Sequence, residues 1–258
     1  MIALSSRFIS VLDHTPGAVA RWLRSNARTT RLLRPVVNAA LPDREVVVRV
    51  RSGVGAGLRM PIHARSEKYY WTGTHERHVQ RALAELLRPG MTFWDVGAHI
   101  GFFSLLAARF VTSTGHVEAF EPFPPNQVRL GASIQLNHAT AVSIHGVALS
   151  AVTGTASFHA SSSSLMGSLV PNGSNTPMPV RCIRADDAVA TIRAPDVVKI
   201  DVEGAELAVL RGASRMLASV RPTVLLELTT ADMVSEVREL VPTYRTTNIG
   251  ANHWVLEP

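Results

Sequence analysis

The chain has one cysteine, Cys182, so it forms no disulfide within itself. It also lacks any apolar run of the roughly 18 residues that a membrane-spanning helix needs. Near the N-terminus a short apolar run is interrupted by Asp13, so this segment is a poor secretory signal. Charged residues make up only 18% and aromatic residues 6% of the 258 residues, whereas 46% are hydrophobic. This composition argues against a disordered chain or a disulfide scaffold, and it predicts a cytoplasmic protein with one sizeable core and a small appendage.

Positive charge gathers near the N-terminus. Residues 1–60 contain ten arginines and three acidic residues, a net charge of +7, while the whole chain carries +6. Arg21, Arg24, Arg28 and Arg31 recur at helical spacing and therefore share one face of a predicted helix. Such a face is either solvated or in contact with an anionic surface, such as a membrane headgroup, a lipid-linked sugar or nucleic acid. A transit peptide is a further interpretation.

Two extended runs follow this basic segment. Residues 46–50 and 58–62 flank a glycine-rich turn and predict a β-hairpin. We therefore divide the chain into a basic N-terminal extension, residues 1–74, which carries the helix and the hairpin, and a second domain, residues 75–258. At the start of that domain, Thr74 is the expected cap of an amphipathic helix.

From Met91 onward, strands alternate with helices. The predicted strands are residues 92–96, 116–120, 142–147, 197–202 and 223–227, and the predicted helices are residues 102–111, 125–136, 205–217 and 231–240. Because the strands are apolar on both faces, they indicate an α/β fold with a doubly wound, mostly parallel sheet that helices cover on each side. Residues 161–179 are rich in Ser, Gly, Pro and Asn and predict either a disordered loop or a lid over an active site.

The first strand-to-helix turn of this sheet reads DVGAHIG and contains Asp95, Gly97 and Gly101. It lacks the middle glycine of the dinucleotide fingerprint, and no lysine in the chain is followed by Ser or Thr, which excludes a Walker-type phosphate loop. A carboxylate beside the first glycine repels a pyrophosphate but suits a cationic amino acid tail, such as that of S-adenosylmethionine. The next strand ends in Glu121, where a carboxylate is placed to accept hydrogen bonds from both hydroxyls of a ribose.

The chain resembles the FkbM family of S-adenosylmethionine-dependent methyltransferases in the strings FWDVGAHIGFFSLLAARF, VEAFEPFPPN, VALSAVTGTASF and VVKIDVEGAELAVLRGA. The resemblance runs from about Tyr69 to Leu228. It implies a class I methyltransferase fold, which is Rossmann-like, with a seven-stranded sheet whose last strand is antiparallel. It also implies methyl transfer to hydroxyl oxygens, often of sugars or polyketide-type products. The cofactor-binding residues predicted on this basis are Asp95, Gly97, Ala98, Gly101, Glu121 and Ala148. The family usually has Asn where this chain has His99.

Acidic residues follow one another toward the carboxyl end of the strand VVKIDVEG, where alternation places Lys199, Asp201 and Glu203 on one side. In one scheme, Asp201 is the general base, with a pKa raised by burial or by neighbouring carboxylates, and Glu203 is a second catalytic candidate. In another scheme, Asp201, Glu203 and Glu227 bind Mg²⁺, which lowers the pKa of a bound hydroxyl. In a third interpretation, Lys199 forms a structural ion pair with one carboxylate.

Histidine and aromatic residues supply further candidates. His99 lies on the cofactor loop and is a candidate base or acceptor contact. Three aromatic residues cluster in KYYWTG, residues 68–73, and are expected either to cover the cofactor or a sugar or to pack onto the core. His75 and His78 are expected at the surface or at an interface.

These residues predict an S-adenosylmethionine-dependent O-methyltransferase that acts on a hydroxyl of a small-molecule or glycosyl acceptor, such as a natural product or a lipid-linked sugar. The alternative is an RNA-binding methyltransferase that docks through its basic N-terminal segment. Nucleic acid is the less expected partner, because the basic charge lies outside the predicted core and has no interleaved aromatic residues. A third hypothesis is a scaffold or sensor that binds the cofactor without catalysis.

Overall fold

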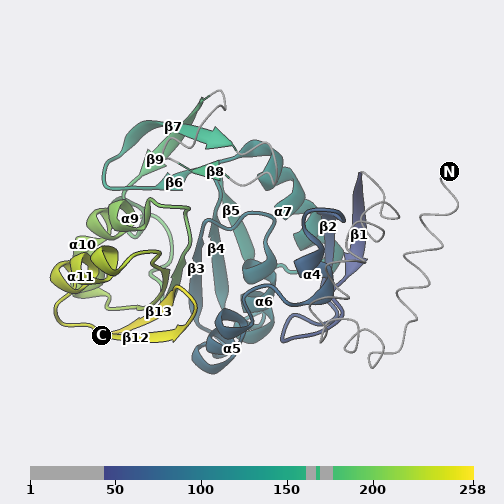
Figure 1. Cartoon of the computed structure of the whole chain (residues 1–258), viewed down its shortest axis with the longest axis horizontal. Coiled ribbons are helices and arrows are strands. Elements are labelled where there is room, and N and C mark those ends of the chain that lie inside the picture. Colours follow the sequence, from purple (N-terminus) through teal and green to yellow (C-terminus); the bar gives the residue numbers. More distant parts are fainter. Residues whose placement is uncertain (1–43, 161–166, 169–176) are drawn as a thin grey trace, which may run out of the picture.

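The computed structural model describes residues 44–160, 167–168 and 177–258, which are built around one large sheet (Figure 1). The predicted basic helix of residues 1–43 and most of the predicted lid, residues 161–179, lie outside the described residues. Within the described part of the chain, no helix has both the length and the hydrophobicity to cross a membrane.

The central sheet has seven strands in the order β12-β13-β11-β10-β3-β4-β5. Their bounds are β3 (Thr92–Val96), β4 (His116–Phe120), β5 (Val142–His145), β10 (Val197–Ile200), β11 (Thr223–Glu227), β12 (Arg245–Gly250) and β13 (His253–Glu257). Strand β13 runs antiparallel to both of its neighbours, and the other pairs are parallel. The order and the single reversed strand confirm the predicted class I methyltransferase fold.

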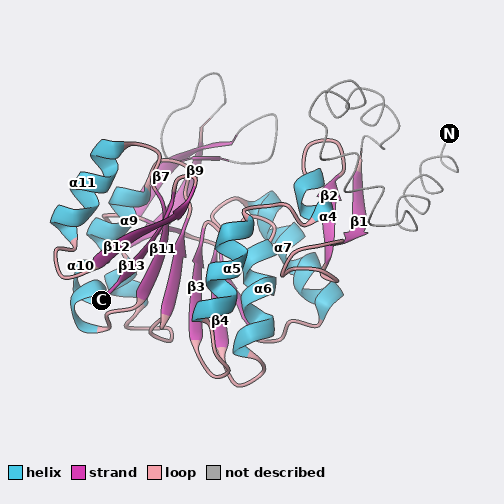
Figure 2. Ribbon diagram, turned by 60° about the horizontal axis from the view of Figure 1, so that its bottom comes forward, coloured by secondary structure: helices cyan, strands magenta, loops and turns pink. Residues whose placement is uncertain are grey.

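Helices cover both faces of this sheet (Figure 2). One face carries α5 (Arg77–Leu86), α6 (Phe102–Val111) and α7 (Pro124–Asn137); the other carries α8 (Ala185–Ala188), α9 (Glu206–Gly212), α10 (Ser214–Ser219) and α11 (Ala231–Leu240). Alternation along β3 explains the two cores, because Phe93 joins the hydrophobic cluster of α5 and α6, whereas Trp94 and Val96 join the cluster of α9 to α11. The doubly wound architecture follows from strands that are apolar on both faces.

Some element boundaries differ from the sequence-based predictions. Strand β10 ends at Ile200 instead of residue 202, and the helix predicted over 205–217 is divided into α9 and α10 at Ala213. Thr74 does not cap α5, so that prediction is wrong. The N-cap position belongs to Glu76, which adopts a left-handed backbone conformation and makes no capping bond with its side chain.

A second sheet, in the order β6-β9-β7-β8, was not predicted. It consists of β6 (Ala148–Leu149), β7 (Gly154–Ala160), β8 (Gly167–Ser168) and β9 (Met178–Ile183). Strands β6 and β8 have only two residues each, and β7 (GTASFHA) and β9 (MPVRCI) mix apolar with small or polar residues, so their sequence lacks the apolar runs that identified the central strands. Strand β9 begins inside the segment predicted as a loop or lid.

The predicted hairpin is formed by β1 (Glu45–Arg49) and β2 (Arg59–His63), and α4 (Lys68–Thr72) follows it. A buried arginine of α7, Arg129, fastens this region: its guanidinium donates to Glu67 Oε1 over 3.0 Å and to the carbonyl of Pro61 over 3.0 Å. Apolar residues of the hairpin and α4 belong to the same hydrophobic cluster as α5 and α6. The described part of the predicted extension, residues 44–74, is therefore packed onto the sheet-bearing part of the chain. The boundary at residue 74 stays a prediction.

Candidate active site

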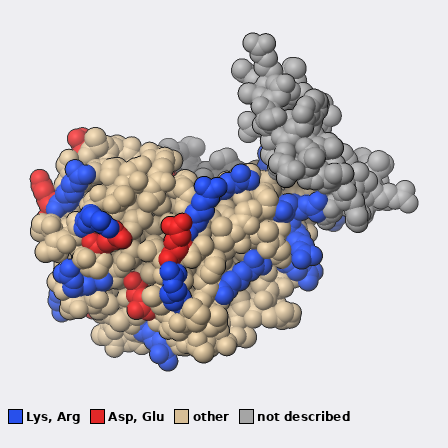
Figure 3. Space-filling model, turned by 90° about the horizontal axis from the view of Figure 1, so that it is seen from below, with Lys and Arg blue, Asp and Glu red and all other residues tan. Residues whose placement is uncertain are grey.

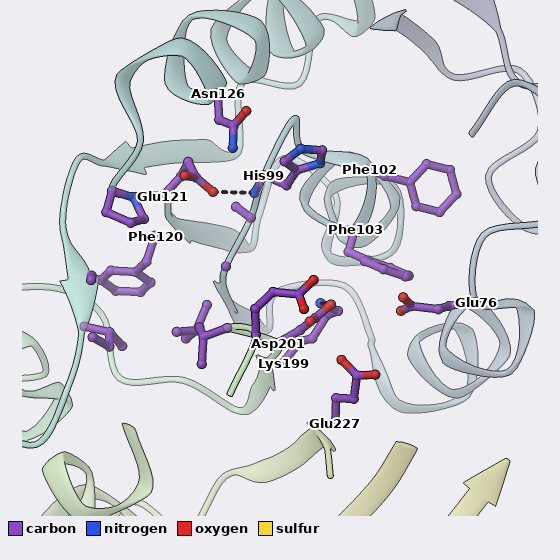
Figure 4. A pocket seen from close by; sticks show the side chains of 18 of the residues that line it. Glu76, His99, Phe102, Phe103, Phe120, Glu121, Asn126, Lys199, Asp201 and Glu227 are labelled. Atoms are coloured by element: carbon purple, nitrogen blue, oxygen red, sulfur yellow. Dashed lines mark hydrogen bonds and ion pairs between the residues drawn. The ribbon is translucent and has the colours of Figure 1, made fainter. Parts of the chain in front are cut away.

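A cavity of about 370 Å³ lies at the carboxyl ends of β3, β4, β10 and β11 (Figure 4). Strand order reverses between β3 and β10, and ligands of open α/β sheets bind at such a switch point. The volume of the cavity falls within the range of small-molecule sites, about 300–1,000 Å³. Glu121 and Asn126 lie on one side of the cavity, the Glu121 side, and Glu76, Asp201 and Glu227 lie on the opposite side.

Glu121 follows β4 directly and is buried. Its carboxylate accepts a hydrogen bond from the backbone N–H of His99 over 2.8 Å and another from the backbone N–H of Phe123 over 2.9 Å. Burial raises the pKa of Glu121 to about 7, although these backbone donors act in the opposite direction. The carboxylate therefore links the loop after β3 to the loop after β4 and keeps lone pairs for a ligand.

The glycine turn shapes the cavity wall but not in every predicted way. Gly97 and Ala98 line the cavity, whereas Asp95 and Gly101 do not. Gly97 has φ +84°, and a Cβ on it would lie 1.9 Å from the carbonyl oxygen of Asp201, so its close approach is to the end of β10. Gly101 has φ +88° and allows α6 to start against Leu130 of α7. Both glycines are thus required by packing between neighbouring elements.

Asp95 is 1% exposed and lies behind the cavity wall. Its Oδ2 accepts a hydrogen bond from Ser104 Oγ over 2.5 Å, while Oδ1 has no partner among the described residues. Burial raises the pKa of Asp95. Asp95 is not among the residues that line the cavity, and its contact with the cationic tail of a cofactor stays a prediction. Its carboxylate supports the start of α6 beneath the loop.

Apolar residues close the Glu121 side of the cavity. Phe120 at the end of β4 lines it, together with Ala148 and Leu149 of β6 and Phe158 of β7. Ala148, predicted from the sequence as a cofactor residue, is therefore at the wall. The second sheet contributes three of these four residues, so it forms part of the site even though sequence patterns did not identify it. An apolar slot beside a hydrogen-bonding carboxylate suits a flat heteroaromatic ring attached to a ribose.

On the opposite side, Lys199 and Asp201 form a buried ion pair. Lys199 Nζ lies 2.8 Å from Asp201 Oδ2 and 4.7 Å from the centre of the Phe103 ring. Burial acts to raise the pKa of Asp201, but the adjacent ammonium outweighs it and holds that pKa at about 2. The prediction that burial or other carboxylates raise the pKa of Asp201 is therefore wrong. The third interpretation, an ion pair with Lys199, describes the geometry.

Glu227 and Glu203 have the opposite electrostatics. Burial, with the charge of Asp201 next in importance, raises the pKa of Glu227 to about 7, and the same two causes raise the pKa of Glu203. Glu227 ends β11 and points into the cavity (Figure 4). Among the described residues, no three His, Cys, Asp or Glu side chains are grouped so as to hold a metal ion. The predicted Mg²⁺ site of Asp201, Glu203 and Glu227 is thus not supported by the arrangement of these side chains.

His99 lines the cavity, as predicted, and is held by its neighbours. Its Nδ1 lies 3.0 Å from the hydroxyl oxygen of Tyr70, and burial lowers its pKa to about 4. The imidazole is therefore neutral at physiological pH. With so low a pKa, His99 is a weak base at neutral pH. Its position instead makes it a hydrogen-bonding group at the edge of the Glu121 side of the cavity.

Sequence reasoning left several lining residues either without a site role or, in the case of Tyr69 and Tyr70, undecided between covering a ligand and packing onto the core. Tyr69 and Tyr70 come from α4, and His75 and Glu76 come from the turn before α5. The expected surface position of His75 is wrong, since burial lowers its pKa and its ring packs 5.2 Å from that of Phe103. The aromatic cluster at residues 68–73 signalled that this region could cover a ligand, and no local pattern pointed to Glu76.

The face in Figure 3 bears Lys and Arg side chains at separated positions, several of them beside acidic side chains. Its described surface shows no continuous basic track of the kind that follows a nucleic acid backbone. The predicted basic helix lies outside the described residues, so this observation concerns only the part of the chain that the structure describes.

Comparison with known proteins adds the following matches. A model of the FkbM methyltransferase domain family matches residues 95–246. The chain is 33% identical over 149 residues to the hexuronic acid methyltransferase AglP of Haloferax volcanii, which is 56% of this chain and 59% of that protein. The chain therefore spans about three-fifths of the length of this curated relative.

Two solved structures are also similar. A methyltransferase FkbM from Methylobacillus flagellatus KT is 18% identical, with 88% of this chain and 59% of that chain covered and a TM-score of 0.48. Fibrillarin from Aeropyrum pernix, solved with natively bound S-adenosyl-L-methionine, is 11% identical, with 82% and 81% of the two chains covered and a TM-score of 0.47.

Proposed function

This chain belongs to the FkbM methyltransferase domain family, and from that premise we propose that it transfers a methyl group from S-adenosylmethionine to a hydroxyl oxygen of a sugar or another small molecule. The observation that carries the proposal is the single cavity that joins the Glu121 side to the Lys199–Asp201–Glu227 side. One side has the groups that suit a nucleoside, and the other has carboxyls that suit proton removal. The methyl group would pass between them.

The residues on the first side fit the cofactor. Glu121 accepts from the ribose hydroxyls, and the apolar wall of Phe120, Leu149 and Phe158 packs against the adenine. The bound cofactor supplies a methyl group that its sulfonium already activates. Gly97 and Ala98 have no side chain or a small one, so the backbone of the turn can approach the cofactor closely. The loop stays in place because Glu121 binds the N–H of His99.

On the second side, Glu227 is the proposed general base. An alcohol is a weak nucleophile until its proton is being removed, and a base with a pKa near the working pH removes it most effectively. Glu227, with a pKa of about 7, meets that requirement, whereas Asp201, with a pKa of about 2, does not. As the new oxygen–methyl bond forms and the sulfur–methyl bond breaks, the hydroxyl proton passes to Glu227.

Asp201 then has an electrostatic role. Its carboxylate stays ionised beside Lys199, and its charge adds to burial, the larger cause, in raising the pKa of Glu227 to about 7. Mg²⁺ is the alternative partner of these acids. A divalent cation there would stand next to the Lys199 ammonium, which lies 2.8 Å from Asp201 Oδ2, and the two positive charges would repel each other.

A sugar is the proposed acceptor class. Tyr69 and Tyr70 offer aromatic surface beside the cavity, and sugar rings pack on such surfaces. The relative from Haloferax volcanii is named a hexuronic acid methyltransferase, which supports a sugar acceptor without identifying this one. The aromatic surface and the relative point to the same class of molecule.

The test is methyl transfer from labelled S-adenosylmethionine to a panel of methyl glycosides and hydroxylated aromatic compounds, with the full chain. Mass spectrometry of the products then identifies the methylated oxygen. We expect an ether on a sugar hydroxyl and S-adenosylhomocysteine in equal amount. Transfer to none of the hydroxylated compounds, by a protein that binds S-adenosylmethionine, would contradict the proposal.

A further inference from the structure

Glu76 holds an unusual backbone conformation at the cavity. Its φ of 37° and ψ of 60° lie in the left-handed region, which disfavours residues with a Cβ. Seven non-glycine residues among those described have positive φ, and three of them, Glu76, His99 and Glu203, line this one cavity. Strained residues that gather at a cavity indicate a functional constraint, because packing elsewhere has to maintain them. Glu76 has no role in the methyl transfer proposed above.

Two histidines lie beside the carboxyl of Glu76. His253 Nε2 lies 3.3 Å from Glu76 Oε2, although neither atom has a hydrogen-bond partner among the described residues, and His253 Nδ1 lies 2.8 Å from Nε2 of His78, which is on the first turn of α5. His75 Nε2 lies 3.7 Å from the other carboxyl oxygen, Oε1. Burial acts to raise the pKa of Glu76, but the proximity of His253 and the neighbouring charges lower it on balance. The carboxyl of Glu76 is therefore ionised at neutral pH.

The Glu76 carboxylate lies on the side of the cavity opposite Glu121, where the proposed acceptor would bind. Figure 4 shows Glu76 pointing toward Lys199 and Asp201, with Glu227 nearby. His253 lies opposite Glu227 in the pairing of β13 with β11. The same histidine is therefore a neighbour of both Glu227 and Glu76. The base and Glu76 thus border the same space from two different elements.

Acidic side chains outnumber cationic ones in that space, although the raised pKa values of Glu203 and Glu227 reduce their charge at neutral pH. Four acidic side chains line it, Glu76, Asp201, Glu203 and Glu227, and the cation among the lining residues is Lys199, which already pairs with Asp201. His75 adds no charge at neutral pH, because its pKa is lowered. An additional carboxylate there would meet repulsion from several acids, and like-charge contacts of this kind cost several kcal/mol. Hydroxyl groups, by contrast, are good donors to carboxylates.

We propose that Glu76 is an acceptor-binding carboxylate, which accepts hydrogen bonds from hydroxyls of an uncharged sugar ring and excludes a ring that carries a carboxylate at that position. The proposal rests on the methyl transfer proposed above and makes its acceptor more specific. It differs from what the name of the Haloferax volcanii relative suggests, since a hexuronic acid bears a carboxylate.

A matched pair of sugars tests it. Methyl β-D-glucopyranoside and methyl β-D-glucopyranosiduronic acid differ only in the carboxylate, and the full-length protein is assayed with each for kcat/KM and for binding by saturation-transfer NMR in the presence of S-adenosylhomocysteine. We expect the wild type to favour the uncharged sugar by at least about tenfold. Glu76→Gln keeps the size and removes the charge, so it should reduce that preference about tenfold or more while KM for S-adenosylmethionine stays unchanged.

A second variant separates function from stability. Glu76→Gly removes the strained Cβ, so the melting temperature should not fall, yet the KM for the uncharged sugar should rise about 10–100-fold because a charged hydrogen-bond acceptor is lost. His138→Gly is the control, since His138 is also left-handed but exposed at the end of α7 and away from the cavity. It should leave both KM values unchanged.

Several results would overturn the inference. A wild type that prefers the uronic acid, or a Glu76→Gln protein with the wild-type ratio, would show that Glu76 does not select the acceptor. Absence of binding of either sugar to the loaded protein would do the same. Preference for the uronic acid together with methylation of a hydroxyl would leave the proposed function intact, so the two failures are distinguishable.

Discussion

Lys199 Nζ lies 2.8 Å from Asp201 Oδ2, at the carboxyl end of the strand beside the glycine turn. This contact divides the roles of the acids in the cavity. Asp201, next to the ammonium, stays ionised well below neutral pH, and its negative charge in turn raises the pKa of Glu227. Two carboxyls on neighbouring strands thus have pKa values pushed apart, which is how one site obtains both a fixed charge and a base near neutrality.

Removing the cation should expose the cost of a buried unpaired charge. Lys199→Met keeps the length of the side chain but leaves Asp201 uncompensated, so we expect a loss of about 3–5 kcal/mol in the free energy of unfolding at neutral pH. Arg245→Met, which breaks an exposed ion pair with Glu257, is the control and should cost about 0–1 kcal/mol. Urea denaturation of both variants measures the difference, and equal losses would contradict the prediction.

The same ion pair has a pH signature. The pKa of Asp201 is lowered from 3.8 to about 2 in the folded protein, so the pair stabilises the native state above pH 3.8 and this contribution is lost as pH falls toward about 2. In Lys199→Met the contribution is absent. The stability difference between wild type and variant should therefore shrink over that pH window, as thermal melts at several pH values can measure. A constant difference down to pH 2 would show that the pair is not its source.

Glu227→Gln should remove the base without removing its shape. We expect turnover to fall about 10²–10⁴-fold while S-adenosylmethionine still binds. In the wild type the rate should rise with pH through about 7, because the ionised form of Glu227 accepts the proton, and the variant should lack this limb. Glu85→Gln, on the exposed face of α5, is the control. An unchanged pH–rate curve in Glu227→Gln would assign the base to another group.

Glu121→Ala should weaken cofactor binding by about 1–3 kcal/mol, because hydrogen bonds to a charged acceptor are lost. Titration calorimetry with S-adenosylmethionine measures the affinity, and Glu85→Ala is the matched control. The carboxylate also binds the N–H groups of His99 and Phe123, so Glu121→Gln, which retains one side-chain oxygen, should be intermediate. Wild-type affinity in both variants, or tighter binding of NAD than of S-adenosylmethionine by the wild type, would refute the assignment.

Chelation distinguishes the two schemes for the acids. If Lys199 keeps its place on Asp201, EDTA should leave turnover unchanged within error, and added Mg²⁺ should have no effect. Loss of activity with EDTA and its recovery with Mg²⁺ would instead support a metal that displaces Lys199. The assay uses the same labelled cofactor and the acceptor found in the glycoside panel.

The fold could be predicted from sequence, and Gly97, Ala98 and Glu121 could be expected at one cavity, because their signals are local. Apolar strands such as Thr92–Val96 alternate with helices over short distances, and the turn DVGAHIG followed by Glu121 spans one strand–helix–strand unit. The periodicity of side chains in each element states which face is buried. Strands β6 to β9 were missed because two of them have only two residues, and the other two, GTASFHA and MPVRCI, have no continuous apolar run.

The acceptor side was decided by the tertiary structure. Whether Asp201 or Glu227 has the higher pKa depends on which of them lies beside Lys199 and on how deeply each is buried, and neither is written in the spacing of the residues. Glu76 lies at the cavity together with Lys199, Asp201 and Glu227, from which it is more than 120 residues distant in the chain, so only the tertiary structure brings these side chains to one space. Electrostatic interactions act through space over a few ångströms, so they are set by the packing of distant segments, whereas the pattern that forms each segment is set within it.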